Sequence, residues 1–327
     1  MTSDFNPGGF TILGFEGTVP GREFISLVEK FPPAGFLLLG DNYESPEQLA
    51  RLIDRLKKIV GGTVLIAVDQ EPGRVCRFKN GFPASYHPSR YVEGKLEDEF
   101  RSWCAETASL LAETGVNLNL APVLDLAAFS YHNPVLTDRV FGDDPVTVST
   151  FARILVEEHK KRGVLTCGKH FPGLGSASFD PHEKLSLSFE SFNRFENHHW
   201  KPFFSTAKQN VELIMTTHLL AEGIDPVNVA TYSTKTIKYL REKIGFSGPI
   251  ISDDLIMGGA GAEDQIGGAS RKSILSGHNL LIISRGTEQQ ARVLDSLKNN
   301  YARDRFFGKI ADQNEEIIGR FKDRILF

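Results

Sequence analysis

The chain has 327 residues, of which 24% are charged and 41% hydrophobic, and its formal net charge is −4. This is the composition of an ordinary soluble globular protein, and its weak negative charge gives no reason to expect nucleic acid or an anionic membrane as a partner. No apolar run approaches the roughly 20 residues that cross a bilayer, and the N-terminus lacks the basic start and apolar core of a signal peptide.

The three cysteines, Cys76, Cys104 and Cys167, are odd in number and far apart. They indicate neither a disulfide framework nor a zinc-type Cys-x-x-Cys pair. The cytoplasm is therefore the expected compartment.

Short apolar runs alternate with longer amphipathic stretches along most of the chain. The runs are rich in Val, Ile and Leu and are bounded by Gly, Pro or charged residues, as is typical of buried parallel strands. These predicted strands cover residues 10–15, 35–40, 64–69, 116–123, 164–169, 213–218, 249–253 and 279–284. The helix-like stretches between them include residues 45–60, 95–114, 145–162 and 233–244.

Eight strands with intervening helices predict an α/β fold, a (β/α)8 TIM-type barrel, with a doubly wound open sheet as the alternative. The barrel is favoured because polar residues recur where strands end, and one barrel face would bring those ends together. The strand-end residues are Asp69, Asp125, Lys169, His170, His218 and Asp253. No change in composition marks a second domain, so residues 1–327 are interpreted as one barrel domain whose tail, at about 312–327, forms a final helix.

The loop that follows the predicted strand at 164–169 carries the densest chemistry. Lys169 and His170 stand at the strand end, and Pro172, Gly173 and Gly175 then interrupt regular structure. Asp180 and His182 come next. At that spacing in an extended segment both side chains point to the same side, so the carboxylate could orient and polarise the imidazole. The alternative is a surface loop with an incidental Asp and His.

Three further groups of charged residues follow other strands. Asp69 and Arg77 flank one turn, and Arg139 lies in a second turn that ends in Asp143 and Asp144. Asp253 follows a fully apolar strand, where a buried carboxylate costs several kcal/mol unless it is paired or hydrogen-bonded. Each group also has a purely structural alternative. The turn with Asp69 and Arg77 could be a salt-bridged turn, Asp143 or Asp144 could merely cap a helix, and Asp253 could belong to a structural ion pair.

No cofactor or metal is expected. His170, Asp180 and His182 could in principle bind zinc, but Lys169 adjoins them and no His-x-x-x-His pair is present. The loop lacks the lysine spacing of a phosphate-binding Walker motif, and no dinucleotide fingerprint opens a helix.

Four motifs, in order, resemble the single-domain bacterial β-N-acetylhexosaminidases (NagZ-type) of glycoside hydrolase family 3. They are Val-Asp-Gln-Glu-x-Gly-Arg-Val at 68–75, Asp-Arg-x-Phe-Gly-Asp-Asp-Pro at 138–145, Lys-His-Phe-Pro-Gly through Asp-x-His at 169–182, and Ser-Asp-Asp-Leu at 252–255. The resemblance covers roughly residues 10–285.

The resemblance implies a role for each matching residue. Asp253 corresponds to the nucleophile, His182 to the acid/base and Asp180 to the residue that orients it. Positions that hold the sugar hydroxyls and N-acetyl group are matched by Asp69, Arg77, Arg139, Lys169 and His170. Where the family usually has Gly-His-Gly-Asp, this chain has Gly173-Leu174-Gly175-Ser176, and Pro72 replaces a glycine.

The implied activity is that of a retaining exo-β-N-acetylglucosaminidase acting on a carbohydrate substrate, through a glycosyl-enzyme on Asp253 with His182 as proton donor and base. Family members release GlcNAc from muropeptides in peptidoglycan recycling. Three alternatives stay open: a phosphorylase, a β-glucosidase-type hydrolase, and a non-catalytic sugar-binding barrel. A monomer is the expected state.

Overall fold

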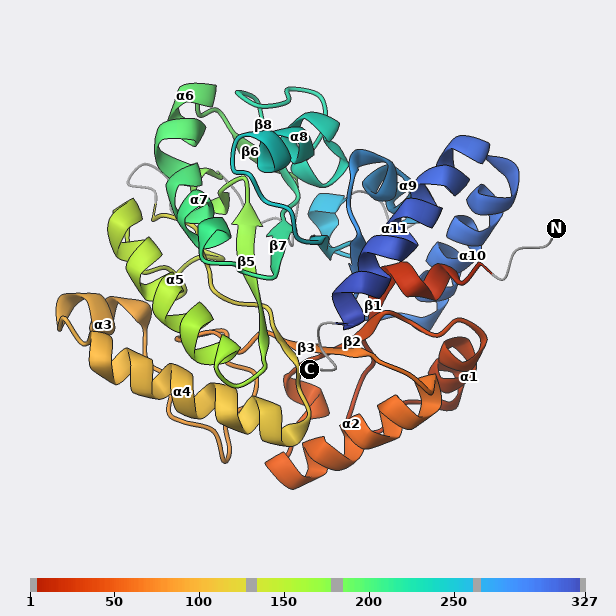
Figure 1. Ribbon diagram of the computed structural model, residues 1–327, viewed down its shortest axis with the longest axis horizontal. Helices are drawn as coiled ribbons and strands as arrows, with labels where there is room; N and C mark the ends of the chain where they lie inside the picture. Colours follow the sequence, from red (N-terminus) through yellow and green to blue (C-terminus); the bar gives the residue numbers. More distant parts are fainter. Residues whose placement is uncertain (1–4, 128–133, 178–184, 261–265, 324–327) are drawn as a thin grey trace.

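The computed structural model describes residues 5–127, 134–177, 185–260 and 266–323 (Figure 1). Its centre is a closed barrel of parallel strands in the order β1-β10-β9-β7-β5-β4-β3-β2. The barrel strands are β1 (Thr11–Leu13), β2 (Gly35–Leu38), β3 (Leu65–Val68), β4 (Leu118–Asn119), β5 (Leu165–Phe171), β7 (Leu213–Thr216), β9 (Ile250–Asp254) and β10 (Leu280–Ile283). The first and last strands pair, with Ile12 opposite Ile282, so the sheet has no free edge.

Each of the eight predicted strand segments contains one barrel strand, and the closed sheet confirms the (β/α)8 TIM-type barrel. The open-sheet alternative is wrong. The boundaries differ slightly, because β5 extends to Phe171 and thus includes Lys169 and His170.

Helices surround the barrel on its outside (Figure 1). The described helices are α1 (Arg22–Lys30), α2 (Pro46–Val60), α3 (Pro88–Glu93), α4 (Glu97–Thr114), α5 (Pro145–Lys160), α6 (Phe192–Arg194), α7 (Trp200–Lys208), α8 (Thr234–Glu242), α9 (Ile266–Ser276), α10 (Thr287–Arg303) and α11 (Arg305–Asp323). Helix α2 begins as expected, because the Ser45 hydroxyl accepts the Gln48 N–H and Pro46 occupies the first position. Asp144 caps α5 in the same way, through the N–H groups of Val146 and Thr147.

The last helix, α11, begins at Arg305 rather than at Asp312. Its start is fixed by Asp304, whose carboxylate accepts the N–H groups of Phe306 and Phe307. A small parallel sheet, β6 (Ser186–Ser188) with β8 (Leu219–Ala221), lies beyond the carboxyl end of the barrel and was not predicted. In the described part of the chain, no helix has the length and apolar character to span a bilayer.

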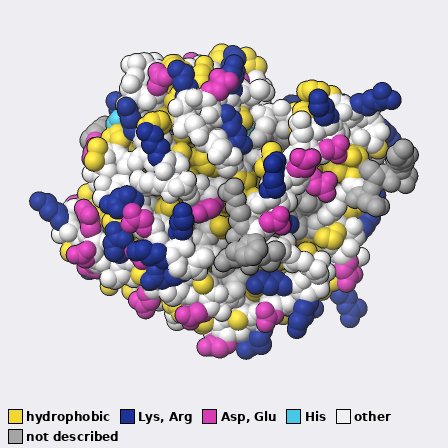
Figure 2. Space-filling model, in the orientation of Figure 1, with side chains coloured by type: hydrophobic (Ala, Val, Ile, Leu, Met, Phe, Trp, Pro, Cys, Tyr) yellow, Lys and Arg dark blue, Asp and Glu magenta, His cyan; other side chains and the backbone are white. Residues whose placement is uncertain are grey.

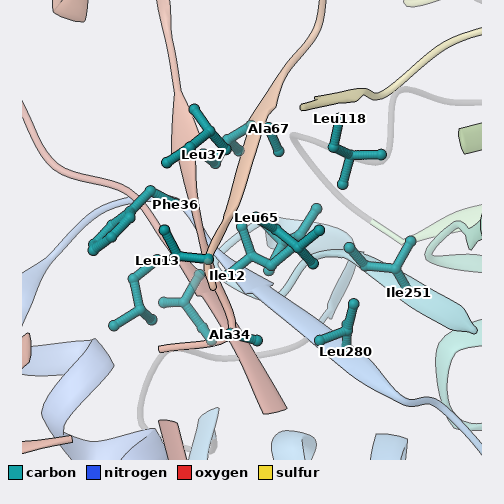
Figure 3. Packing of buried hydrophobic residues seen from close by; sticks show 14 of the residues in the cluster. Ile12, Leu13, Ala34, Phe36, Leu37, Leu65, Ala67, Leu118, Ile251 and Leu280 are labelled. Carbon is teal, nitrogen blue, oxygen red and sulfur yellow. The ribbon is translucent and has the colours of Figure 1, made fainter. Parts of the chain in front are cut away.

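The barrel interior is filled by apolar side chains from neighbouring strands (Figure 3). Ile12, Leu65, Leu118, Ile251 and Leu280 come from five strands, and each is fully buried. Complete burial of such a side chain contributes roughly 1.5–3 kcal/mol. The packed interior leaves the strand ends as the place for a binding site.

The outer surface carries charges of both signs side by side. In Figure 2 lysine and arginine alternate with aspartate and glutamate over α3 and α4. Arg101 on α4, for example, pairs with both Glu157 and Glu158 of α5. These pairs connect neighbouring helices of the outer layer at the surface.

Candidate active site

A pocket of about 470 Å³ opens at the carboxyl ends of the barrel strands. It brings together six of the eight residues that the sequence singled out. These are Asp69, Arg77, Arg139, Lys169, His170 and Asp253. The other two, Asp180 and His182, lie outside the described residues.

Lys169 lies at the centre of a buried charge network. Its Nζ is 2.6 Å from Asp69 Oδ1 and 2.6 Å from Glu71 Oε1, and its side chain is almost completely buried. Burial alone would lower the pKa of Lys169, but the two carboxylates outweigh burial and raise it. Lys169 is therefore a fixed cation at the pocket wall.

Glu71 connects this lysine to Arg139. Its carboxylate accepts two hydrogen bonds of 2.8 Å, from Nε and Nη2 of Arg139, in the planar fork geometry that suits a guanidinium. Burial raises the pKa of Glu71, but the charges of Arg139 and Lys169 outweigh burial and hold it below its ordinary value. Arg139 also donates to the carbonyl of Val135.

Asp69 completes the network on the pocket side. Burial would raise its pKa, but Lys169 and then Arg77 outweigh burial and lower it. The contact with Arg77 is longer, 3.7 Å between Nη2 and Oδ2. Asp69 is thus an ionised acceptor at the pocket wall, able to accept hydrogen bonds from hydroxyl groups.

The loop after β3 is closed by the side chain of Gln70, which is buried. Its amide donates to the Phe78 carbonyl at 2.8 Å and accepts the Phe78 N–H at 3.0 Å. Gln70 also forms an antiparallel bridge with Cys76. This turn returns the chain to the strand end and places Arg77 beside Asp69.

His170 is held by Asp125, which follows β4. Asp125 Oδ2 lies 2.6 Å from His170 Nδ1, and Oδ1 accepts the N–H of Leu174 at 2.6 Å. On the other side of the ring, Arg139 Nη2 is 3.5 Å from Nε2. Because a guanidinium only donates, this arrangement favours the tautomer with its proton on Nδ1, leaving Nε2 as an acceptor.

Neighbouring strand residues normally point to opposite faces, yet Lys169 and His170 both line the pocket. The pairing of β5 with β7 shifts register between Gly168 and Phe171. This local irregularity lets both side chains reach the same site.

Asp253 lies near the end of β9, and its carboxylate faces the same pocket. Within the described residues it accepts one hydrogen bond, at 2.9 Å, from the N–H of Asp254. Asp253 is thus a partly exposed carboxylate with few partners. This environment fits the role of a nucleophile better than the role of a structural ion-pair partner.

Two of the chain's departures from the family loop, Leu174 and Ser176, are buried, and Leu174 forms part of the pocket wall. Ser176 donates to the Gly173 carbonyl. Gly175 is required here, since a Cβ at this position would lie 1.8 Å from the Leu126 carbonyl oxygen. The loop is thus tightly packed through residue 177.

Two important residues were not among the predicted site residues: Glu71 and Asp125. Asp125 stands at the end of a predicted strand, and Glu71 lies inside the 68–75 motif. Both act through a neighbour, because each is buried and bonds to a pocket residue. Among the residues that the structure describes, no three His, Cys, Asp or Glu side chains gather as a possible metal site.

Comparisons with known proteins agree with this architecture. A β-hexosaminidase of Methylococcus capsulatus is 33% identical over 301 residues, which cover 90% of this chain and 87% of that protein. A β-hexosaminidase of Haemophilus influenzae is 30% identical over 322 residues, covering 96% and 89%.

The solved structure of NagZ from Neisseria gonorrhoeae in complex with N-trifluoroacetyl-D-glucosamine matches with a TM-score of 0.80 at 25% identity. The match covers 98% of this chain and 97% of that one. The model of the glycosyl hydrolase family 3 N-terminal domain matches residues 18–305. This protein is therefore a glycoside hydrolase, and it belongs to glycosyl hydrolase family 3.

Proposed function

We propose that this protein is a retaining exo-β-N-acetylglucosaminidase that releases terminal β-linked GlcNAc. The observation that carries the proposal is the meeting of Asp253 with Asp69, Arg139, Lys169 and His170 in one pocket. A nucleophilic carboxylate and a set of fixed polar groups for one sugar are what retaining exo-hydrolysis needs. The names of the relatives, and the N-trifluoroacetyl-D-glucosamine complex of the gonococcal NagZ, support the N-acetyl sugar.

In the proposed mechanism, Asp253 attacks the anomeric carbon and forms a glycosyl-enzyme. His182 protonates the departing oxygen, and Asp180 orients its imidazole. His182 then removes a proton from the incoming water, which releases the sugar with retained configuration. A neutral imidazole suits this role, because its ordinary pKa near 6.5 lies close to working pH and it does not repel an anionic aglycone.

The sugar is proposed to be held from the opposite side of the pocket. Asp69 accepts hydroxyl hydrogen bonds, while Lys169, Arg77 and Arg139 donate to sugar oxygens. His170 completes the set, since it lines the pocket while Asp125 holds its Nδ1. The network orients these groups before substrate arrives, which reduces the entropic cost of binding.

The proposed setting is the cytoplasm, with peptidoglycan-derived muropeptides as the source of GlcNAc. It rests on the resemblance to the NagZ-type branch. A single catalytic domain over residues 1–327 is part of the same proposal.

Two measurements test the function. A panel of aryl β-glycosides of GlcNAc, GalNAc, glucose and xylose, each with and without phosphate, should show GlcNAc preferred over glucose by at least about 10²-fold in kcat/KM. Equal rates on the glucoside would favour a glucosidase, and a strict need for phosphate would favour a phosphorylase. No turnover of any glycoside would favour the binding-protein alternative.

The nucleophile is tested by trapping. A fluorinated, activated N-acetylglucosaminide should label one peptide, and mapping should place the sugar on Asp253. A label on Asp254 or on any other residue would overturn the assignment. Asp253→Ala should lose several powers of ten in rate while its thermal unfolding stays close to that of the wild type.

A further inference from the structure

Asp254, the neighbour of the proposed nucleophile, ties the end of β9 to the end of β10. Its Oδ1 accepts the N–H of Ser284 at 3.1 Å, just beyond β10, and that of Ile256 at 3.3 Å. The second bond closes a turn of the kind that aspartate side chains form with the backbone two residues ahead. Both Asp254 and Ser284 line the pocket.

The backbone of Asp254 is fixed as firmly as its side chain. Its carbonyl oxygen lies 2.8 Å from Nε2 of His218, which follows β7. Because a carbonyl only accepts, Nε2 must carry the proton of this bond. On the other side of the ring, Nδ1 is 2.7 Å from the Thr231 hydroxyl. Asp254 is therefore held between the ends of β7 and β10.

The remaining backbone group of Asp254 points at the nucleophile. Its N–H donates to Asp253 Oδ1 at 2.9 Å. This N–H lies in the Asp253–Asp254 peptide plane, and its direction depends on the placement of Asp254, which the Ser284, Ile256 and His218 contacts hold. Burial raises the pKa of Asp254 to about 6, although the Ser284 and Ile256 hydrogen bonds act in the opposite direction.

We propose that Asp254 is a positioning residue for the reaction: its carboxylate clamps β9 to β10 so that its own N–H holds one oxygen of Asp253 in place. This inference rests on the proposed role of Asp253 as nucleophile. It assigns no proton transfer to Asp254, whose Oδ1 is occupied by two backbone donors.

The test compares Asp254→Ala with Asp254→Asn, because the amide oxygen of Asn can accept the same two N–H groups. The rate of glycosyl-enzyme formation is measured by inactivation with the fluorinated N-acetylglucosaminide, and binding by the affinity for free GlcNAc. Asp254→Ala should react about 10- to 100-fold more slowly, as expected for a misplaced reacting group. Its affinity for GlcNAc should change by less than about threefold, and Asp254→Asn should recover most of the rate.

Asp225→Ala is the matched control. Asp225 accepts the N–H groups of Val227 and Asn228 in a similar turn, but it does not line the pocket. Thermal unfolding of all variants shows how much each change costs in stability. We expect Asp225→Ala to keep the wild-type inactivation rate.

Four outcomes would overturn the inference. They are an Asp254→Asn variant as slow as Asp254→Ala, a parallel loss of GlcNAc affinity, an equal loss in Asp225→Ala, and a covalent label on Asp254. Failure of the proposed function can be told apart from failure of this inference. If the wild type prefers another glycoside, the inactivation rates of the variants relative to the wild type are measured with the fluorinated form of that sugar.

Discussion

The carboxylate of Glu71 accepts hydrogen bonds of 2.8 Å from both Nε and Nη2 of Arg139, although Glu71 itself does not line the pocket. The same carboxylate reaches Lys169 at 2.6 Å. One buried acid therefore sets the position of two cations that we propose to contact the sugar.

Glu71→Gln should impair both stability and binding. Removing one partner of a buried charged group typically costs about 3–5 kcal/mol, since the other charges stay buried without compensation. We expect a loss of that order in the free energy of unfolding measured by denaturant titration, and a higher KM because Arg139 is no longer held.

Glu157→Gln is the control for Glu71→Gln. Glu157 pairs with Arg101 and Arg153 on the surface, with 39% of its side chain exposed. Exposed pairs contribute about 0–1 kcal/mol, so this variant should keep wild-type KM and nearly wild-type stability. Equal behaviour of the two variants would contradict the role given to Glu71.

Asp125→Asn should act on catalysis through His170. The carboxylate accepts the imidazole Nδ1–H and the Leu174 N–H, and an amide cannot accept both in the same way because one of its two groups only donates. We expect kcat/KM for an aryl GlcNAc glycoside to fall by about 10- to 100-fold. Asp304→Asn, which alters a helix cap distant in sequence, should leave kcat/KM unchanged. An unaltered rate in Asp125→Asn would mean that His170 needs no support from Asp125.

The sequence was sufficient to predict the barrel, because its signals are local. Apolar runs such as Ile250–Ile251 are followed within two residues by a charged residue, and Ser45 with Pro46 marks a helix start. The β6–β8 pair escaped prediction because three-residue strands carry almost no periodicity. The start of α11 was placed too late because Asp304 was not identified as its cap.

The site was predictable where a residue stands at a strand end, as Asp69 and Asp253 do. The site was not predictable where the contact between two side chains depends on the path of a loop in three dimensions. Glu71 meets Arg139 only because Gln70 closes the loop after β3, and the two residues are 68 positions apart in the chain. The partners of Asp254 are likewise set by the register between β9 and β10, which no local pattern encodes.

Buried histidines should make the fold sensitive to acid. His199 packs beside Gly173 and is 3% exposed, and burial lowers its pKa to about 4. Between pH 6.5 and 4 the His199 imidazole is protonated in the unfolded chain but stays neutral in the folded chain. The free energy of unfolding therefore falls as pH falls through this window. One such histidine lowers the free energy of unfolding by about 2 kcal/mol when the pH falls from 7.5 to 5.

His199→Phe removes this titrating group and keeps an aromatic ring against Phe195. Denaturant titrations at pH 7.5 and 5 should show a smaller loss of stability than in the wild type. If His199→Phe lost as much stability as the wild type, His199 would not contribute to acid sensitivity.

The proposed general acid, His182, can be tested through the leaving group. A departing oxygen needs a proton only when it is basic, so the effect of losing the acid should grow with leaving-group pKa. His182→Ala should retain much of its rate on a dinitrophenyl glycoside, which departs unaided. On a methylumbelliferyl glycoside or a disaccharide, the rate should fall further, by about 10²–10⁴-fold.

Because His182 is also the proposed base for the second step, kcat alone would mix the two effects. The comparison must use kcat/KM or pre-steady-state rates, which report formation of the glycosyl-enzyme. Asp180→Ala should show the same trend more weakly, since it removes the orienting carboxylate and leaves the imidazole. A uniform loss over all leaving groups, with unchanged thermal unfolding, would instead assign His182 to sugar binding or loop structure.

Azide provides an independent test of the same role. In His182→Ala, azide should restore turnover and yield the β-glycosyl azide. The reason is that a small anionic nucleophile needs no base to attack the sugar on Asp253.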